Sequence, residues 1–143
     1  MKIHLLGEET IIEIEVIGRS HPKCTDYWDG NWIISNIRIE VPGYRAQFKA
    51  DLRTDELRNF GNELKLMDKK LKGKASLINL DGYLEIECEI NKQGTIHWTS
   101  ETCYPAGIGA VLKFDFSSDQ SYLKGIVQEI ESILSIFPVF GKP

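Results

Sequence analysis

The stretch Asp26-Tyr27-Trp28-Asp29-Gly30-Asn31-Trp32 separates a short amphipathic strand unit from a regular region of strands and helices. It combines three aromatic rings with two carboxylates, a carboxamide and a glycine. Asp29-Gly30 and Gly30-Asn31 are strong turn dipeptides, because glycine and asparagine tolerate a positive φ. The stretch therefore predicts a turn between two strands. Trp28 and Trp32 would either clasp each other across that turn or fold over the end of a sheet.

On both sides of this turn, apolar and polar residues alternate with the period of two that is typical of strands with one buried face. Residues 10–17 alternate cleanly before it. Residues 33–41 and 44–51 alternate after it and are joined by Pro42-Gly43, a tight-turn pair, so they predict a hairpin. Further strands are predicted at residues 2–6, 74–78, 83–90, 95–102 and 108–116. Strands with one apolar and one polar face favour an antiparallel sheet.

Two segments have the helical period instead. A single apolar stripe is formed by Leu57, Phe60, Leu64, Met67 and Leu71. Thr54 suits the N-cap of this helix, and Gly73 suits its C-terminal end. A second helix is expected to start at residues 117–120, where Ser117 and Gln120 fit a capping box, and to end before Pro138. The predicted fold class is α+β, a curved antiparallel sheet with two amphipathic helices packed on one face.

The composition indicates one domain over residues 1–143, because no linker, repeat or low-complexity segment divides the chain. The net charge of −4 and pI of about 5.4 argue against nucleic acid or an anionic membrane as partner, since both select basic surfaces. Acidity suits a basic protein partner. Acidic residues at positions 8–9 come too early for a signal peptide, and no apolar run approaches the ~20 residues of a membrane span. The expected location is the cytosol.

No motif for catalysis, a metal or a cofactor is visible. Cys24, Cys88 and Cys103 are far apart, with no CxxC and no histidine at ligand spacing, so neither a disulfide framework nor a zinc site is predicted. His97 beside Trp98 is interpreted as a surface histidine, because no oriented partner can be named. The chain is therefore not predicted to be an enzyme. The alternative is a small enzyme or ligand-binding domain with a pocket between sheet and helices.

The strand at residues 83–90 carries three carboxylates on one face, Glu85, Glu87 and Glu89, with neighbours about 7 Å apart. Three interpretations are open. Paired carboxylates serve glycosidases or bind cations. A solvated sheet face with cross-strand ion pairs would show the same pattern. The third interpretation is an electrostatic patch for a basic protein. The basic residues considered for the cross-strand pairs are Arg38, Arg45, Lys49 and Lys113.

The aromatic residues of the stretch 26–32 have two interpretations, one structural and one functional, which are compatible with each other. Large aromatic side chains usually serve burial, so the tryptophans would cap the core. Tyrosine and tryptophan are also typical interface anchors, and carboxylates pair with a partner's lysine or arginine. The candidate contact residues in this stretch are Asp26, Tyr27, Trp28 and Asp29.

Five further stretches, taken together with residues 26–32, show a resemblance to a known family. They are Val41-Pro42-Gly43-Tyr44, Phe48-Lys49-Ala50-Asp51-Leu52-Arg53-Thr54, Pro105-Ala106-Gly107-Ile108-Gly109, Asp119-Gln120-Ser121-Tyr122-Leu123 and Ile133-Leu134-Ser135-Ile136-Phe137-Pro138-Val139. Together with residues 26–32, they resemble the WapI-like family of bacterial immunity proteins in order and spacing over nearly the whole chain.

This resemblance implies a function. Such proteins are encoded beside large secreted or wall-associated toxins with a nuclease-like C-terminal domain, and they neutralise the toxin by binding it in the cytosol. The resemblance therefore implies a non-catalytic, stoichiometric inhibitor of a basic toxin domain. The expected contacts are the four candidate residues of 26–32 and the glutamate face Glu85, Glu87 and Glu89.

Overall fold

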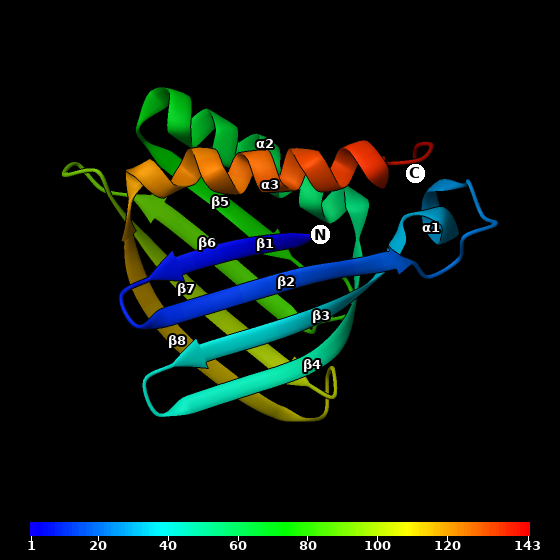
Figure 1. Cartoon of the computed structure of the whole chain (residues 1–143), viewed down its shortest axis with the longest axis horizontal. Coiled ribbons are helices and arrows are strands. Elements are labelled where there is room, and N and C mark those ends of the chain that lie inside the picture. The colour runs from blue at the N-terminus through cyan, green and yellow to red at the C-terminus, as the bar shows by residue number, and fades with distance from the viewer.

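The strands form two separate antiparallel sheets in the computed structural model, which describes residues 1–143 (Figure 1). The first sheet contains, in spatial order, β1 (Lys2–Gly7), β2 (Thr10–Arg19), β3 (Trp32–Val41) and β4 (Tyr44–Arg53). The second contains β5 (Gly73–Ile78), β6 (Leu84–Ile90), β7 (Thr95–Tyr104) and β8 (Ala110–Asp119). Each strand pairs with the next along the chain, as short antiparallel connections favour.

One long helix follows each sheet. Helix α2 (Thr54–Lys70) comes after β4, and α3 (Leu123–Ile136) comes after β8 and the 3-10 turn η1 (Gln120–Tyr122). A short helix, α1 (Tyr27–Gly30), lies between β2 and β3. The same order of four strands and a helix thus occurs twice, although the sequence shows no repeat. The two long helices run side by side, with α2 beside β5 and α3 beside β1 (Figure 1).

The α+β class is confirmed, but the single curved sheet is not. The apolar faces of the two sheets pack against each other, and the long helices close one side of this sandwich (Figure 1). One core cluster of 29 buried residues draws on both sheets and both long helices. Alternation specifies which side chains point inward, but it does not specify which strands pair. No helix has the length and apolar character needed to cross a membrane.

The ends of the helices differ in how well they match the sequence prediction. Helix α2 begins at Thr54, so the prediction of Thr54 as its N-cap is wrong by one residue. The N-cap is Arg53, whose backbone N–H donates to the Glu56 carboxylate at 3.0 Å. The predicted start of the last helix at residues 117–120 is wrong. Ser118 belongs to β8, where its Oγ accepts a hydrogen bond from the buried indole of Trp98 at 2.8 Å. The pairing of β8 with β7 therefore continues to Asp119, beyond the predicted start of the helix.

Candidate functional site

The predicted turn at residues 26–32 is a single turn of helix, α1. The Asp26 carboxylate caps it by accepting the backbone N–H of Asp29 at 3.0 Å, and this hydrogen bond holds the pKa of Asp26 below its usual range. Position 30 has room only for glycine, because a Cβ there would lie 2.9 Å from the carbonyl oxygen of Cys24. The local sequence thus specifies the reversal, while its packing comes from elsewhere.

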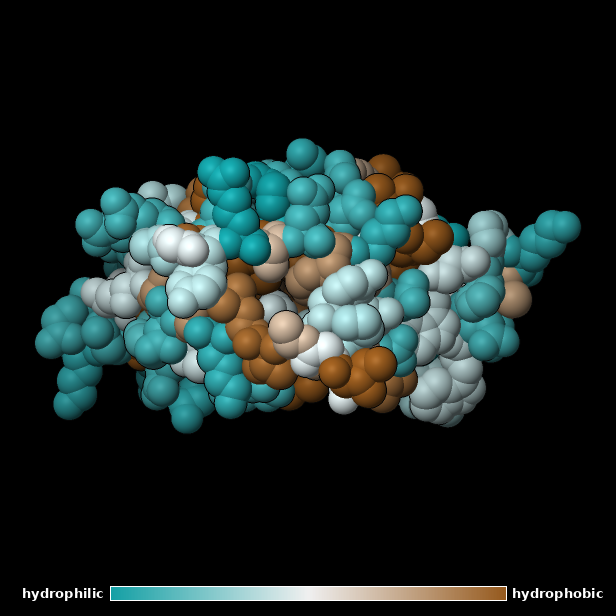
Figure 2. All heavy atoms as spheres, turned by 90° about the horizontal axis from the view of Figure 1, so that it is seen from below, coloured by the Kyte–Doolittle hydropathy of each residue, from teal (hydrophilic) through white to brown (hydrophobic).

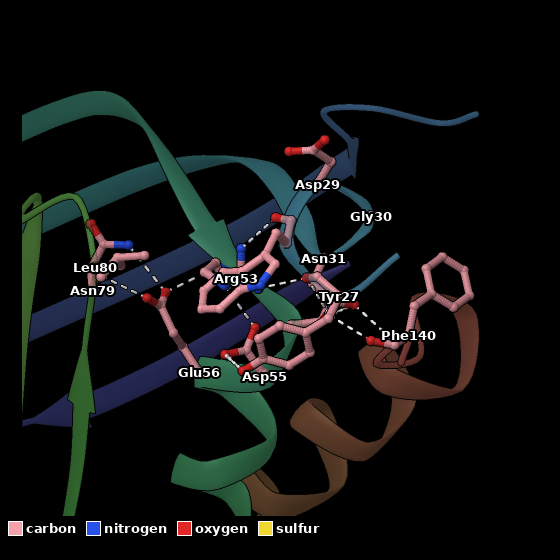
Figure 3. Close-up of polar contacts among 12 residues, drawn as sticks. Tyr27, Asp29, Gly30, Asn31, Arg53, Asp55, Glu56, Asn79, Leu80 and Phe140 are labelled. Carbon is pink, nitrogen blue, oxygen red and sulfur yellow. Dashed lines mark hydrogen bonds and ion pairs between the residues drawn. The ribbon is translucent and has the colours of Figure 1, made fainter. Parts of the chain in front are cut away.

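Arg53 is the residue that holds α1 against the domain (Figure 3). Its side chain is only 2% exposed, and its guanidinium donates to Asp55 Oδ1 at 2.9 Å. It also donates to the backbone oxygens of Trp28 at 2.7 Å and Tyr27 at 2.8 Å. The guanidinium carbon lies 5.1, 5.6 and 4.8 Å from the ring centroids of Tyr27, Trp28 and Trp32. These are cation–π distances, so the two tryptophans share Arg53 as a contact.

Asn31 anchors the C-terminal tail to the same region (Figure 3). Its side chain is fully buried. The amide Nδ2 donates to the backbone oxygens of Tyr27 at 2.9 Å and Phe140 at 3.0 Å. Its Oδ1 accepts from the Thr54 hydroxyl at 3.1 Å and from the Phe140 backbone N–H at 2.8 Å. One carboxamide therefore joins α1, α2 and the tail.

Glu56 extends this network to the second sheet (Figure 3). Its carboxylate accepts the Asn79 amide at 3.1 Å and the Leu80 backbone N–H at 2.6 Å. Burial of the carboxyl group raises the pKa of Glu56, although these donors act in the opposite direction. Asn79 also donates to the Asp51 backbone oxygen at 2.9 Å. These hydrogen bonds join the start of α2 and the end of β4 to the loop after β5.

The four candidate contact residues at α1 divide into two groups. Tyr27 is half-buried, and its hydroxyl donates to Asp55 Oδ2 at 3.0 Å, so it helps to position α1. Asp26, Trp28 and Asp29 are exposed, and Trp28 is 58% exposed. The two carboxylates and the Cys24 sulfur lie within 4.8 Å of one another. The surface of α1 thus presents one exposed indole and a pair of neighbouring carboxylates.

The three glutamates of β6 lie exposed on the outer face of the second sheet, as predicted. Register places them in three rows across the sheet: Ile78–Glu85–Glu101–Lys113, Ser76–Glu87–Thr99–Asp115 and Lys74–Glu89–His97–Ser117. We call these twelve residues the acidic face. It carries five carboxylates and two lysines. Glu85 lies directly opposite Glu101, and like charges in such a pair repel.

The cross-strand ion pairs expected to neutralise this face are largely absent. Arg38, Arg45 and Lys49 belong to the first sheet, and only Lys113 shares the sheet with the glutamates. Three of the four basic residues considered for these pairs thus lie in the other sheet, because alternation does not reveal which sheet a strand joins. Lys74 approaches Glu89 at 3.8 Å, a weak surface ion pair. The acidic face therefore carries an excess of negative charge.

The structure does not bring the two sets of predicted residues together. Helix α1 projects beyond the end of the first sheet, whereas β6 is an inner strand of the second sheet (Figure 1). No hydrogen bond or ion pair links Asp26, Trp28 or Asp29 to the β6 glutamates. They are two separate surfaces of the chain. The network around Arg53, which sequence reasoning missed, supports only the first of them.

The core cluster fills the space between sheets and helices. The alternative hypothesis of a small enzyme or ligand-binding domain placed its pocket there. Cys88 is part of that cluster, and burial raises the pKa of its thiol to about 12, so it stays protonated near neutral pH. His97 is exposed on the acidic face, 4.0 Å from the Asp115 carboxylate. It borders a surface hollow together with Lys74, Glu87 and Glu89.

Comparison with known structures shows the same fold in proteins of unrelated sequence. MRP1/MRP2 of Trypanosoma brucei has a TM-score of 0.53 and 8% identity, with 94% of this chain and 84% of that chain covered. The plant transcriptional regulator PBF-2 has a TM-score of 0.52 and 8% identity, with 96% and 81% covered. At this identity the likeness shows the fold alone. Comparison with curated protein sequences gave no match.

The family comparison is more specific. The model of the immunity protein WapI-like family matches residues 4–138, nearly the whole chain. The match includes α1, the network around Arg53 and all strands of the acidic face. Immunity proteins of this kind generally act by binding a toxin protein. The chain belongs to the WapI-like immunity protein family.

Proposed function

We propose that the chain is a cytosolic immunity protein that neutralises a cognate toxin by stoichiometric, non-catalytic binding, and that the toxin is a basic, nuclease-like domain. Membership of the family supports the role of toxin neutralisation. The basic character of the partner is inferred from the charge of this chain, since complementary charge steers association and selects partners.

The observation that carries the proposal is the acidic face. Its five carboxylates against two lysines form the kind of surface that a nucleic-acid-binding domain, itself basic, would contact. The repulsion between Glu85 and Glu101 would be relieved by a lysine or arginine placed between them. A toxin bound here would have its own basic, substrate-binding surface covered, which blocks the toxin without any chemical step.

The exposed surface of α1 supplies a second contact. Trp28 offers a large amphipathic ring, and Asp26 and Asp29 add two exposed carboxylates. Tryptophans at the centre of interfaces often dominate the binding energy. Because Arg53 and Asn31 fix the position of α1, this surface is preorganised and loses little conformational freedom on binding.

Co-expression with the toxin domain encoded next to this gene tests the proposal. The expected result is continued growth and a co-purified one-to-one complex. A double variant, Glu85→Lys with Glu87→Lys, should lose protection. The matched control is Glu8→Lys with Glu131→Lys, which changes the net charge equally at exposed residues outside the acidic face. Growth arrest with the wild-type chain and no co-purified toxin would refute the proposed function.

A further inference from the structure

The two sheets have four edge strands, and the fold protects only two of them. Helix α3 lies along β1, and α2 lies along β5. The edges of β4 and β8, each ten residues long, have no paired strand, and they border the side of the sandwich opposite the helices (Figure 1). Unpaired edges offer backbone N–H and C=O groups to another chain. This side is therefore structurally open.

Apolar side chains that point inward come to the surface on this open side. Tyr44 of β4 is 65% exposed and Tyr104 of β7 is 49% exposed, although the register places both on the inner faces of their sheets. Leu112 and Phe114 of β8 are only partly covered. Tyr44, Leu112 and Phe114 line a common hollow. Figure 2, which views the molecule from this side, shows apolar surface along its middle.

Only the first part of the β8 edge is free. A Cβ on Gly7, the last residue of β1, would lie 2.7 Å from the Ser117 carbonyl oxygen, so the end of β1 already lies against the end of β8. Residues 110–115 precede that contact, and residues 111–115 border the hollow. A free edge of this length matches the usual length of a single strand.

Charge distinguishes β8 from β4 as the edge that a basic partner would use. The outer side chains of β4 include Arg45 and Lys49. A strand added to β8 would instead continue the acidic face, which carries five carboxylates against two lysines; it would lie next to Asp115 and Lys113, with β8 and β7 between it and the β6 glutamates. The same strand would present its other side chains to the apolar hollow, because side chains alternate along a strand.

We propose that an extended segment of the partner, with alternating apolar and basic residues, pairs with β8 at residues 110–115. Its apolar side chains pack against Tyr44, Leu112 and Phe114, and its basic side chains lie over Asp115 and the acidic face. This inference rests on the proposed function and specifies how the toxin is held. Backbone hydrogen bonds supply affinity in this mode, and the alternating side chains supply selectivity.

A second copy of this chain is a less suitable occupant. Pairing of two β8 edges would bring two acidic faces together, which costs free energy through like-charge repulsion. Pairing of β8 with the β4 edge of a second copy would match charges, but it leaves one open edge at each end and would continue as a filament. Self-association is therefore an outcome that the experiment must exclude.

Hydrogen–deuterium exchange of the full chain, alone and with the inactivated toxin domain encoded by the adjacent gene, tests the inference. We expect amides of residues 110–115 to exchange roughly tenfold more slowly in the complex. Tyr44→Ala should weaken binding by roughly tenfold. The control Gln47→Ala, on the outer face of the same strand, should leave binding unchanged.

A stable complex without protection at residues 110–115 would overturn this inference and leave the proposed function intact. Absence of any complex would refute both. Protection of these amides that rises with the concentration of this chain alone would indicate pairing between copies and would overturn the assignment to a partner segment.

Discussion

Replacing Arg53 with alanine should destabilise the protein far more than a typical polar substitution. The change removes three charged hydrogen bonds, to Asp55, Trp28 and Tyr27, from a side chain that is 2% exposed. Hydrogen bonds to charged groups contribute about 1.5–3 kcal/mol each. Part of this loss is recovered when water reaches the freed carbonyl oxygens. We therefore expect the free energy of unfolding to fall by about 3–5 kcal/mol, the usual cost of breaking one buried ion pair.

Urea unfolding followed by tryptophan fluorescence measures this cost. Trp28 and Trp32 both contact the guanidinium, so their emission reports directly on the site. With an m-value of about 2 kcal/mol/M, the midpoint should fall by about 2 M. The control Arg58→Ala changes an exposed arginine on α2 and should stay within about 0.5 kcal/mol of wild type. A loss below 1 kcal/mol for Arg53→Ala would refute the central role of Arg53.

Three further predictions concern separate features. The pKa of Glu56 is raised in the folded state, so its contribution to stability is greatest below the unfolded pKa of about 4.5 and is lost as pH rises through the folded pKa. In urea unfolding, the stability advantage of wild type over Glu56→Gln should therefore shrink between pH 4 and 7. An advantage that increases over this range would contradict the sign of the shift. In thermal unfolding, Gly61→Ala should lower the free energy of unfolding by about 1–3 kcal/mol, because the new Cβ would lie 2.9 Å from the Ile130 side chain. Gly125→Ala adds a Cβ with nothing within 4 Å and should raise the free energy of unfolding by about 1 kcal/mol. Equal effects would exclude close helix packing as the cause. Asn31→Ala should cost about 1–3 kcal/mol and speed amide exchange in the C-terminal tail; an unchanged tail would show that it is held elsewhere.

The sequence was informative wherever local periodicity dictates structure. Alternation identified the strands and the outward direction of Glu85, Glu87 and Glu89, and the stripe from Leu57 to Leu71 located α2. It did not reveal the division into two sheets, because inward-facing positions look the same whether a sheet or a helix covers them. The open edge of β8 was missed for the same reason.

The network around Arg53 was beyond local reasoning. Its partners come from α1, α2 and the loop after β5, and no spacing in the sequence links them. An arginine at the end of a strand is usually a surface residue. The only indication in the sequence was the cluster of three aromatic side chains in residues 26–32, because aromatic rings can stack on a cation as well as pack in a core.

Calorimetric titration of the proposed cognate toxin domain with wild-type chain and with the Glu85→Lys, Glu87→Lys variant tests the role of the acidic face most directly. Folding of the variant is checked by its unfolding transition. We predict that affinity falls by roughly tenfold for each reversed charge, about 1.4 kcal/mol apiece, and that wild-type binding weakens as salt is added. Equal affinity of a folded variant, in a complex insensitive to salt, would contradict the acidic face as the toxin-binding surface.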